Sequence, residues 1–202
     1  PDLVYLPEVD FDMDKFLADV DRIYKEKGNC MVAVSEGIHY ADGSFVSEAK
    51  TAATDGFGHA QLGGLAAILS EAVKERLGTK TRGIELSLLQ RCAAHVASGT
   101  DIQEAYRAGK AAINAALEGK TGKMAGFVCD RTNGYDCQIK LFNLDDVANF
   151  EKKMPDEMIN AEANGVTEKF LEYCTPLVEG ESHLPREDGL PRFCHLKKVL
   201  AK

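Results

Sequence analysis

The chain has 202 residues, of which 45% are hydrophobic and 28% charged, and its formal net charge is -8. This length allows a sizeable core, and the composition is typical of a soluble globular protein. The negative charge excludes a nucleic-acid binder that relies on bulk positive charge, so an anionic ligand needs a local basic pocket. No apolar run reaches the roughly 18 residues of a membrane span and no signal segment opens the sequence, which together predict a cytoplasmic protein.

The first part of the sequence predicts a strand, a helix and a second strand. Residues 3–6 are apolar and end at Pro7, because the residue before a proline is disfavoured in a helix. Apolar residues then recur at helical spacing from a cap at Asp10 to a stop at Gly28. The continuous apolar run 30–34 is typical of a strand that is covered on both faces. This order predicts a βαβ unit with parallel strands.

A loop and two helices are expected in the middle of the chain. Residues 39–56 are polar and small, which indicates a loop, and an apolar stripe over 58–77 predicts a helix that ends at Gly78. A second helix is expected over 101–118. Its stripe is mostly alanine and suits close packing against another element: Ala105, Ala108, Ala112, Ile113, Ala116 and Leu117.

The stretch 82–95, between these helices, concentrates the candidate chemistry. Its apolar residues predict a buried strand that delivers Arg91 at its carboxyl end, where ligands bind in open α/β sheets. A planar guanidinium suits a phosphate or a carboxylate, since it can donate two parallel hydrogen bonds. Arg82 lies too far along the chain to share one strand tip with Arg91, so one of them is expected to serve a neighbouring site or subunit. A surface or ion-pair role remains the alternative for each arginine.

Glu36 is the other candidate, because it follows the apolar run 30–34 and precedes a glycine. Its carboxylate could accept hydrogen bonds from sugar hydroxyls, while a solvated turn residue is the alternative. The sequence contains no GxSxG, GxGxxG or GxxxxGK[ST] motif, so it predicts neither a serine nucleophile nor a phosphate-binding loop.

The last third of the chain predicts a hairpin followed by short helices. Extended stretches over 122–129 and 135–144 flank an Asn-Gly pair at 133–134, a strong hairpin turn. Helical segments near 145–153 and 164–174 are expected next, and residues 178–202 are expected to form a surface tail.

Six cysteines lie without a CxxC pair and the histidines have no ligand spacing, which favours free thiols and no metal site: Cys30, Cys92, Cys129, Cys137, Cys174 and Cys194.

Several short motifs occur in a specific order: Leu6-Pro7-Glu8, Ser35-Glu36-Gly37-Ile38, Phe57-Gly58-His59 with Gln61-Leu62-Gly63-Gly64, Lys80-Thr81-Arg82 and Gln90-Arg91. Over about residues 1–150, this set resembles the C-terminal half of a phosphofructokinase, closest to the lineage that includes many pyrophosphate-dependent enzymes. The resemblance implies part of an α/β fold, a three-layer Rossmann-like and mostly parallel sheet with helices on both faces. It also implies a homo-oligomer, a dimer or a tetramer.

The resemblance assigns roles to three residues. Glu36 matches the glutamate that accepts hydrogen bonds from the hydroxyls of fructose 6-phosphate, and Arg91 matches an arginine that holds its 6-phosphate. Arg82 matches the arginine that reaches this phosphate from the adjacent subunit. Leu88 departs from the family, which usually has His or Tyr there, and leucine can neither donate nor accept a hydrogen bond.

The family's phosphate-donor loop and its aspartate-rich segment, which supplies the general base and positions Mg2+, lie N-terminal to the matched half. This chain begins with Pro1 and lacks both, so we expect a piece of a longer protein with no catalytic residue of its own, inactive alone. The sequence does not decide whether the phosphoryl donor is pyrophosphate or ATP.

Residues 101–150 are expected to pack on the missing lobe. When this lobe is absent, their uncovered apolar side chains are expected to drive self-association. The alternatives are a non-catalytic sugar-phosphate-binding or regulatory α/β module and a different α/β enzyme that reuses the two arginines.

Overall fold

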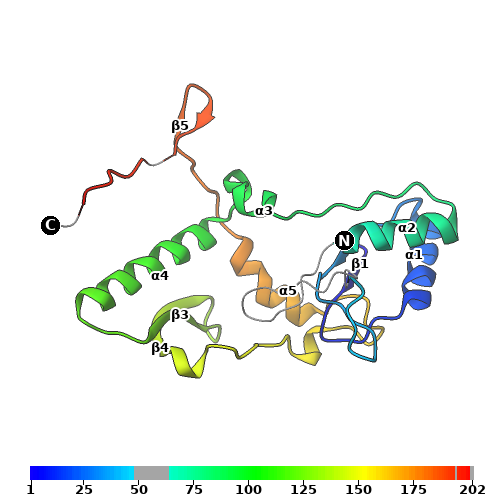
Figure 1. The fold of residues 1–202 in the computed structure, drawn as a ribbon, viewed down its shortest axis with the longest axis horizontal. Coiled ribbons are helices and arrows are strands. Elements are labelled where there is room, and N and C mark those ends of the chain that lie inside the picture. The colour runs from blue at the N-terminus through cyan, green and yellow to red at the C-terminus, as the bar shows by residue number, and fades with distance from the viewer. Residues whose placement is uncertain (48–63, 194, 201–202) are drawn as a thin grey trace. The chain divides into compact units, whose positions relative to one another are not determined.

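The computed structural model describes residues 1–47, 64–193 and 195–200 (Figure 1). They divide into two compact units, each of which is built from two stretches of chain. Unit 1 comprises Pro1–Ser87 and Glu151–Glu172, and unit 2 comprises Leu88–Phe150 and Tyr173–Lys202.

Unit 1 begins with the predicted strand, helix and strand. Strand β1 (Leu3–Tyr5) pairs in parallel with β2 (Val32–Val34), and helix α1 (Met13–Lys27) connects them. The parallel pairing confirms the predicted βαβ unit. In β2, Ala33 is exposed while its two valines are half-buried, so only one face of this strand is covered. The expectation of a strand covered on both faces is therefore wrong for the described residues.

The ends of α1 follow from its capping residues. The helix begins after Asp12, whose side chain accepts a hydrogen bond from the Lys15 N–H at 2.8 Å, and not after Asp10 as the sequence predicted. It ends at Gly28 as predicted, because this glycine takes the left-handed conformation with φ 76°.

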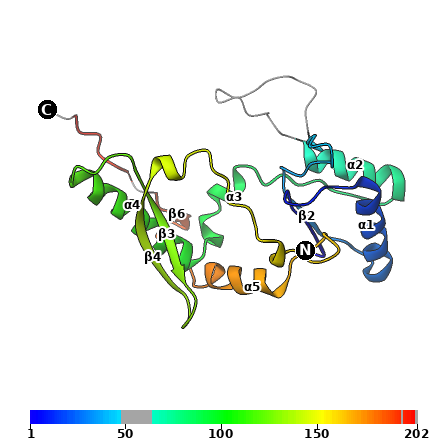
Figure 2. The same ribbon diagram turned by 90° about the horizontal axis from the view of Figure 1, so that it is seen from below.

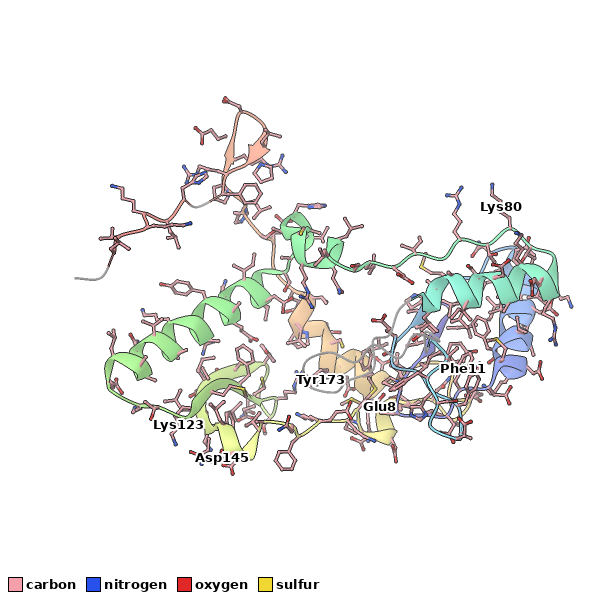
Figure 3. All side chains as sticks on the ribbon, viewed as in Figure 1. Glu8, Phe11, Lys80, Lys123, Asp145 and Tyr173 are labelled. Carbon is pink, nitrogen blue, oxygen red and sulfur yellow. The ribbon has the colours of Figure 1, made fainter. Side chains whose placement is uncertain are left out.

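Helix α2 (Leu65–Leu77) packs against α1 and completes the core of unit 1. Its end at Gly78 confirms the prediction, whereas the predicted start near residue 58 lies outside the described residues. The rings of Tyr5, Phe11 and Phe16 meet with centroids 5.4 to 5.6 Å apart, and Figure 3 labels Phe11 among the surrounding side chains. The core consists of Leu3, Tyr5, Phe11, Phe16, Leu17, Val20, Ile23, Ile38, Val46, Leu65, Leu69 and Val73.

Unit 2 is built on a hairpin and a long helix. Strands β3 (Lys123–Asp130) and β4 (Asp136–Asn143) pair antiparallel, which confirms the predicted hairpin, and helix α4 (Gly99–Leu117) contacts both strands (Figures 1 and 2). Helix α3 (Leu89–Cys92) and a 3-10 turn, Ala94–Val96, precede α4.

The side of α4 that is buried beside the hairpin is not the apolar stripe described in the sequence analysis. The buried residues of α4 are Glu104 and Ala115, and Ala108 and Ala111 on the same side are half-buried. Glu104 is buried because it accepts a hydrogen bond from the Tyr135 hydroxyl at 2.6 Å. Most members of the predicted stripe are exposed, which agrees with the expectation that it is left uncovered in this chain: Ala105, Ala112, Ile113, Ala116 and Leu117. Its packing on another lobe stays a prediction.

The remaining elements are short. The predicted helix near 145–153 is wrong, since only the 3-10 turn Leu144–Asp146 forms there. Residues 164–174 become helical only as α5 (Glu168–Cys174). Further 3-10 turns are Asp156–Met158 and Thr175–Val178, and the tail forms a small exposed hairpin of β5 (Arg186–Glu187) and β6 (Leu190–Pro191).

The sheets of the described residues are three separate strand pairs. Only the β1–β2 pair is parallel, and the β3–β4 and β5–β6 pairs are antiparallel. The mixture of helices and strands agrees with the predicted α/β class. One continuous, mostly parallel sheet is not formed within the part of the chain that the structure describes.

Candidate functional site

The carboxyl ends of β1 and β2 lie at one edge of unit 1, because the two strands run parallel in register, with Tyr5 opposite Val34. A glutamate follows each strand at this edge, Glu8 after β1 and Glu36 after β2. Ligands of open α/β sheets bind outside the carboxyl ends of the strands, so this edge is the candidate site of unit 1.

Glu36 occupies a turn whose backbone is fixed from two sides. The Ile38 N–H donates to the Ser35 carbonyl at 3.3 Å, and the fully buried Ser47 hydroxyl donates to the Glu36 carbonyl at 3.4 Å. The side chain of Glu36 is exposed. The turn therefore holds the backbone in place while the carboxylate stays free to accept hydrogen bonds from solvent or from a ligand.

Glu8 is a second polar group at this edge and was not among the predicted site residues. Its Oε1 accepts a hydrogen bond from the Met154 N–H at 2.9 Å, which ties the 151–172 stretch to β1. Its Oε2 is buried and has no hydrogen-bond partner among the described residues. The sequence did contain a signal for Glu8, because a glutamate follows shortly after each of the two strands that were predicted to be parallel.

A polar cluster around Asp19 lies on α1. Its carboxylate accepts hydrogen bonds from the Asn164 amide at 2.8 Å, the Tyr5 hydroxyl at 3.0 Å and the Lys15 ammonium at 3.2 Å. Burial alone would raise the pKa of Asp19, but the donors, Asn164 first, outweigh burial and hold this pKa below its usual range. Burial and the nearby Asp19 carboxylate raise the pKa of Tyr5. The cluster joins β1, α1 and the 160–166 turn.

An open pocket of about 780 Å³ borders this cluster. Its charged and amide lining side chains include Lys15, Asp19, Arg22, Asn160, Glu162 and Asn164. Residues far apart in the chain line the pocket, so no local pattern in the sequence predicts it.

Arg82 lies in an extended segment of unit 1 that runs beside α2. The Thr81 hydroxyl donates to the Ser70 carbonyl at 2.9 Å, and a Cβ on Gly83 would lie only 2.5 Å from the Ala66 carbonyl oxygen. These two close approaches fix the backbone on both sides of Arg82 and leave its side chain exposed. Figure 3 labels Lys80 at the beginning of this segment.

The buried strand predicted for the 82–91 stretch is wrong. Residues 79–86 form no strand, and their apolar side chains Ile84 and Leu86 are exposed. No described strand pairs with this segment, and without a partner strand and a covering layer an apolar run has no sheet to join.

Arg91 belongs to unit 2 and lies in the short helix α3, not at a strand end. The Arg91 N–H donates to the Leu88 carbonyl at 3.0 Å, and both side chains are exposed. Leu88 thus contributes its backbone to the turn that positions Arg91, while its side chain offers no polar group.

The three predicted site residues are divided between the units, with Glu36 and Arg82 in unit 1 and Arg91 in unit 2. Among the described residues, no hydrogen bond or ion pair joins Glu36 to Arg82. The described part of the chain also has no group of three or more His, Cys, Asp or Glu side chains that could hold a metal ion, and no helix long and apolar enough to cross a membrane.

Comparison with known proteins found close relatives, although no family model matches the chain. A pyrophosphate--fructose 6-phosphate 1-phosphotransferase of Methylococcus capsulatus is 43% identical over 98% of this chain and 46% of its own length. A protein of the same name from Xanthomonas campestris is 43% identical over 98% of this chain and 48% of its own length. The crystal structure of a pyrophosphate-dependent phosphofructokinase from Marinobacter aquaeolei superposes with a TM-score of 0.80 at 38% identity, over 100% of this chain and 46% of that one.

The chain therefore spans about half the length of the relatives that it matches. The resemblance to phosphofructokinases is confirmed, and so is the α/β fold class, because the similarity in sequence and in structure extends over nearly the whole chain.

Proposed function

We propose that this chain, a homologue of about half of a pyrophosphate-dependent phosphofructokinase, is the C-terminal, sugar-phosphate-binding part of such an enzyme. The observation that carries the proposal is the 43% identity over 98% of the chain to a pyrophosphate--fructose 6-phosphate 1-phosphotransferase. The whole protein would transfer a phosphoryl group to the 1-hydroxyl of fructose 6-phosphate. The donor is pyrophosphate or ATP, and the names of the relatives favour pyrophosphate.

The assigned roles suit the chemistry of the three site residues. Glu36 presents an exposed carboxylate on a fixed turn, which suits it to accept hydrogen bonds from sugar hydroxyls. The exposed guanidinium of Arg91 can donate two parallel charge-assisted hydrogen bonds to a phosphate. Arg82 would reach this phosphate from the adjacent subunit of a homo-oligomer.

The chain alone is expected to be inactive. Phosphoryl transfer requires a positioned donor and neutralised charge at both phosphates. The described residues contain no acidic or histidine cluster that fits a magnesium ion, so we assign them no step through this metal. Incubation of the purified chain with fructose 6-phosphate and either donor should yield no fructose 1,6-bisphosphate, and detectable turnover would contradict this.

Calorimetric titration of fructose 6-phosphate into the purified chain tests the binding role. Arg91→Ala should weaken binding roughly 30-fold, because loss of a bidentate charge-assisted contact costs about 2 kcal/mol. Arg186→Ala is the matched control, since it removes another exposed arginine of unit 2. Equal binding by the Arg91 and Arg186 variants would favour a different α/β protein that uses its arginines elsewhere.

Mixed oligomers test whether the site is shared. If Arg82 acts on the neighbouring subunit, a hybrid of one Arg82→Ala subunit and one Arg91→Ala subunit has one site with both arginines intact. The hybrid should then bind fructose 6-phosphate at one site with wild-type affinity. If both sites of the hybrid bind fructose 6-phosphate more weakly than the unmutated protein, each site lacks one arginine. The two arginines of a site would then come from the same subunit.

The alternative is a non-catalytic sugar-phosphate-binding module. A co-expression experiment distinguishes an enzyme part from such a module. The chain is co-expressed with the part of the Methylococcus capsulatus relative that it does not match. Recovery of pyrophosphate-dependent activity would support an enzyme part, and sugar-phosphate binding without activity in the assembled complex would support the module.

A further inference from the structure

Two cysteines that form no CxxC motif lie directly opposite each other in the β3–β4 hairpin. The strand register pairs Cys129 with Cys137. Opposite residues of an antiparallel pair place their side chains on the same face, with Cα atoms about 4.5 to 5.5 Å apart. This spacing lies within the range of about 4.4 to 6.8 Å over which a disulfide forms without backbone movement.

The two thiols have different surroundings. Cys137 is buried, with 3% of its surface exposed, whereas Cys129 is exposed. Burial, and then the adjacent Cys129 side chain, raise the pKa of the Cys137 thiol. Cys137 is therefore protonated and shielded, and an oxidant in solution meets Cys129 first.

Contacts with α4 hold the pair in place. The Tyr135 hydroxyl lies 3.7 Å from the Cys129 Sγ and donates to Glu104 at 2.6 Å. The Arg107 guanidinium donates to the carbonyl of Cys137. Because both ends of the cysteine pair are tied to one helix, the two thiols stay in register with each other.

We propose that Cys129 and Cys137 form a reversible disulfide site that responds to peroxide. The Cys129 thiolate attacks one peroxide oxygen, the O–O bond breaks, and Cys129 becomes a sulfenic acid while hydroxide leaves and takes a proton. The Cys137 sulfur then attacks the sulfenic sulfur, the S–S bond forms and water departs with the Cys137 proton. Two thiols and one hydrogen peroxide thus give one disulfide and two waters, and a dithiol reductant reverses the reaction. This site does not depend on the proposed phosphofructokinase function.

Trypsin makes the disulfide directly measurable. Cleavage after Lys123, Arg131 and Lys140 places Cys129 in peptide 124–131 and Cys137 in peptide 132–140. The purified chain is treated with a small excess of hydrogen peroxide, its remaining thiols are alkylated, and it is digested without reductant. Mass spectrometry should find the two peptides linked, and dithiothreitol should separate them. Thiol titration should show a loss of two of the six cysteine thiols.

Two variants provide matched controls. Cys129→Ser should abolish the linked peptides, while Cys92→Ser, which removes another exposed cysteine of unit 2, should leave them unchanged. The mapping on the unmutated chain stands even if a variant does not fold. The proposal is overturned if Cys129 oxidises to a sulfinic acid, or links to Cys174 or to a second chain, while Cys137 remains a free thiol.

Discussion

The two units differ in how completely each buries its own apolar side chains. In unit 1, strands β1 and β2 and helices α1 and α2 enclose a continuous core. In unit 2, the buried apolar residues among those described are Ala115 and Cys137, while large apolar side chains on α4 point outward: Ile102, Tyr106, Ile113 and Leu117. A unit with its own core can be stable by itself, whereas exposed apolar stripes mark a surface that another surface covers. The difference indicates that unit 1 is the self-sufficient part of the chain.

The largest expected effect comes from opening the core of unit 1. Phe16 is 2% exposed and packs against the rings of Tyr5 and Phe11, so Phe16→Ala should lower the free energy of unfolding by about 3 to 5 kcal/mol. Tyr106→Ala, on the outer face of α4, should change it by less than about 0.5 kcal/mol. Urea unfolding of both variants checks this, and similar losses would remove the contrast between the units.

The Asp19 cluster should make unit 1 sensitive to acid. Asp19→Asn should cost about 1 to 3 kcal/mol near pH 7, because it weakens the hydrogen bonds from Asn164, Lys15 and Tyr5. Since the pKa of Asp19 is lower in the folded than in the unfolded state, its contribution is fully present above about pH 4 and is lost as the pH falls through the folded pKa.

The free energy of unfolding, measured by urea between about pH 6 and pH 2, tests the sign of this effect. The difference between the unmutated chain and Asp19→Asn should shrink on acidification. Asp145→Asn, at an exposed position of unit 2 labelled in Figure 3, is the control and should have no such effect. A difference that grows below pH 4 would refute the assigned role of Asp19.

A smaller effect is expected at the start of α4 in unit 2. The Ser98 hydroxyl accepts a hydrogen bond from the Asp101 N–H at 3.0 Å and donates to the Leu177 carbonyl at 2.6 Å. Ser98→Ala should therefore cost about 1 kcal/mol in urea unfolding of unit 2. Ser98→Asp keeps the helix cap but not the donated bond, so it should recover only part of this loss. Full recovery would mean that the bond to Leu177 contributes nothing.

The smallest effect on stability is expected on the outer face of α4. Ile113→Glu should change the free energy of unfolding by less than about 0.5 kcal/mol, because this side chain is 64% exposed. It should nevertheless reduce self-association of the chain, measured by light scattering at high concentration, since a charge disrupts an apolar contact. Thr121→Glu adds the same charge at an exposed position of unit 2 outside α4 and should leave association unchanged. A monomeric unmutated chain would contradict the self-association hypothesis.

Some features of the structure were predictable because they are local. The ends of α1 and α2 follow from Gly28 and Gly78, which adopt left-handed conformations that other residues rarely take. The β3–β4 hairpin follows from two extended stretches joined by an Asn-Gly turn. The ordered motifs were enough to identify the relationship to phosphofructokinases.

Other features depend on what lies beside a segment, and these were decided only by the tertiary structure. The apolar run from Ile84 to Leu88 reads as a buried strand, but it finds no partner strand among the described residues and stays exposed. On α4, the hydrogen bond from Tyr135 satisfies the buried Glu104 carboxylate on the side that contacts the hairpin. The large apolar side chains of this helix, such as Ile113 and Leu117, are exposed instead.

By itself, the sequence determined the first βαβ unit, the β3–β4 hairpin, the glycines that end α1 and α2, and the resemblance to phosphofructokinases, since each of these depends on residues that are close together in the chain. Only the tertiary structure showed three other features: the pairing of Cys129 with Cys137, the buried Glu8 oxygen without a hydrogen-bond partner, and the division of the site residues between two units. The physical reason is that strand register and burial are set by contacts between segments distant in sequence, which local periodicity does not encode.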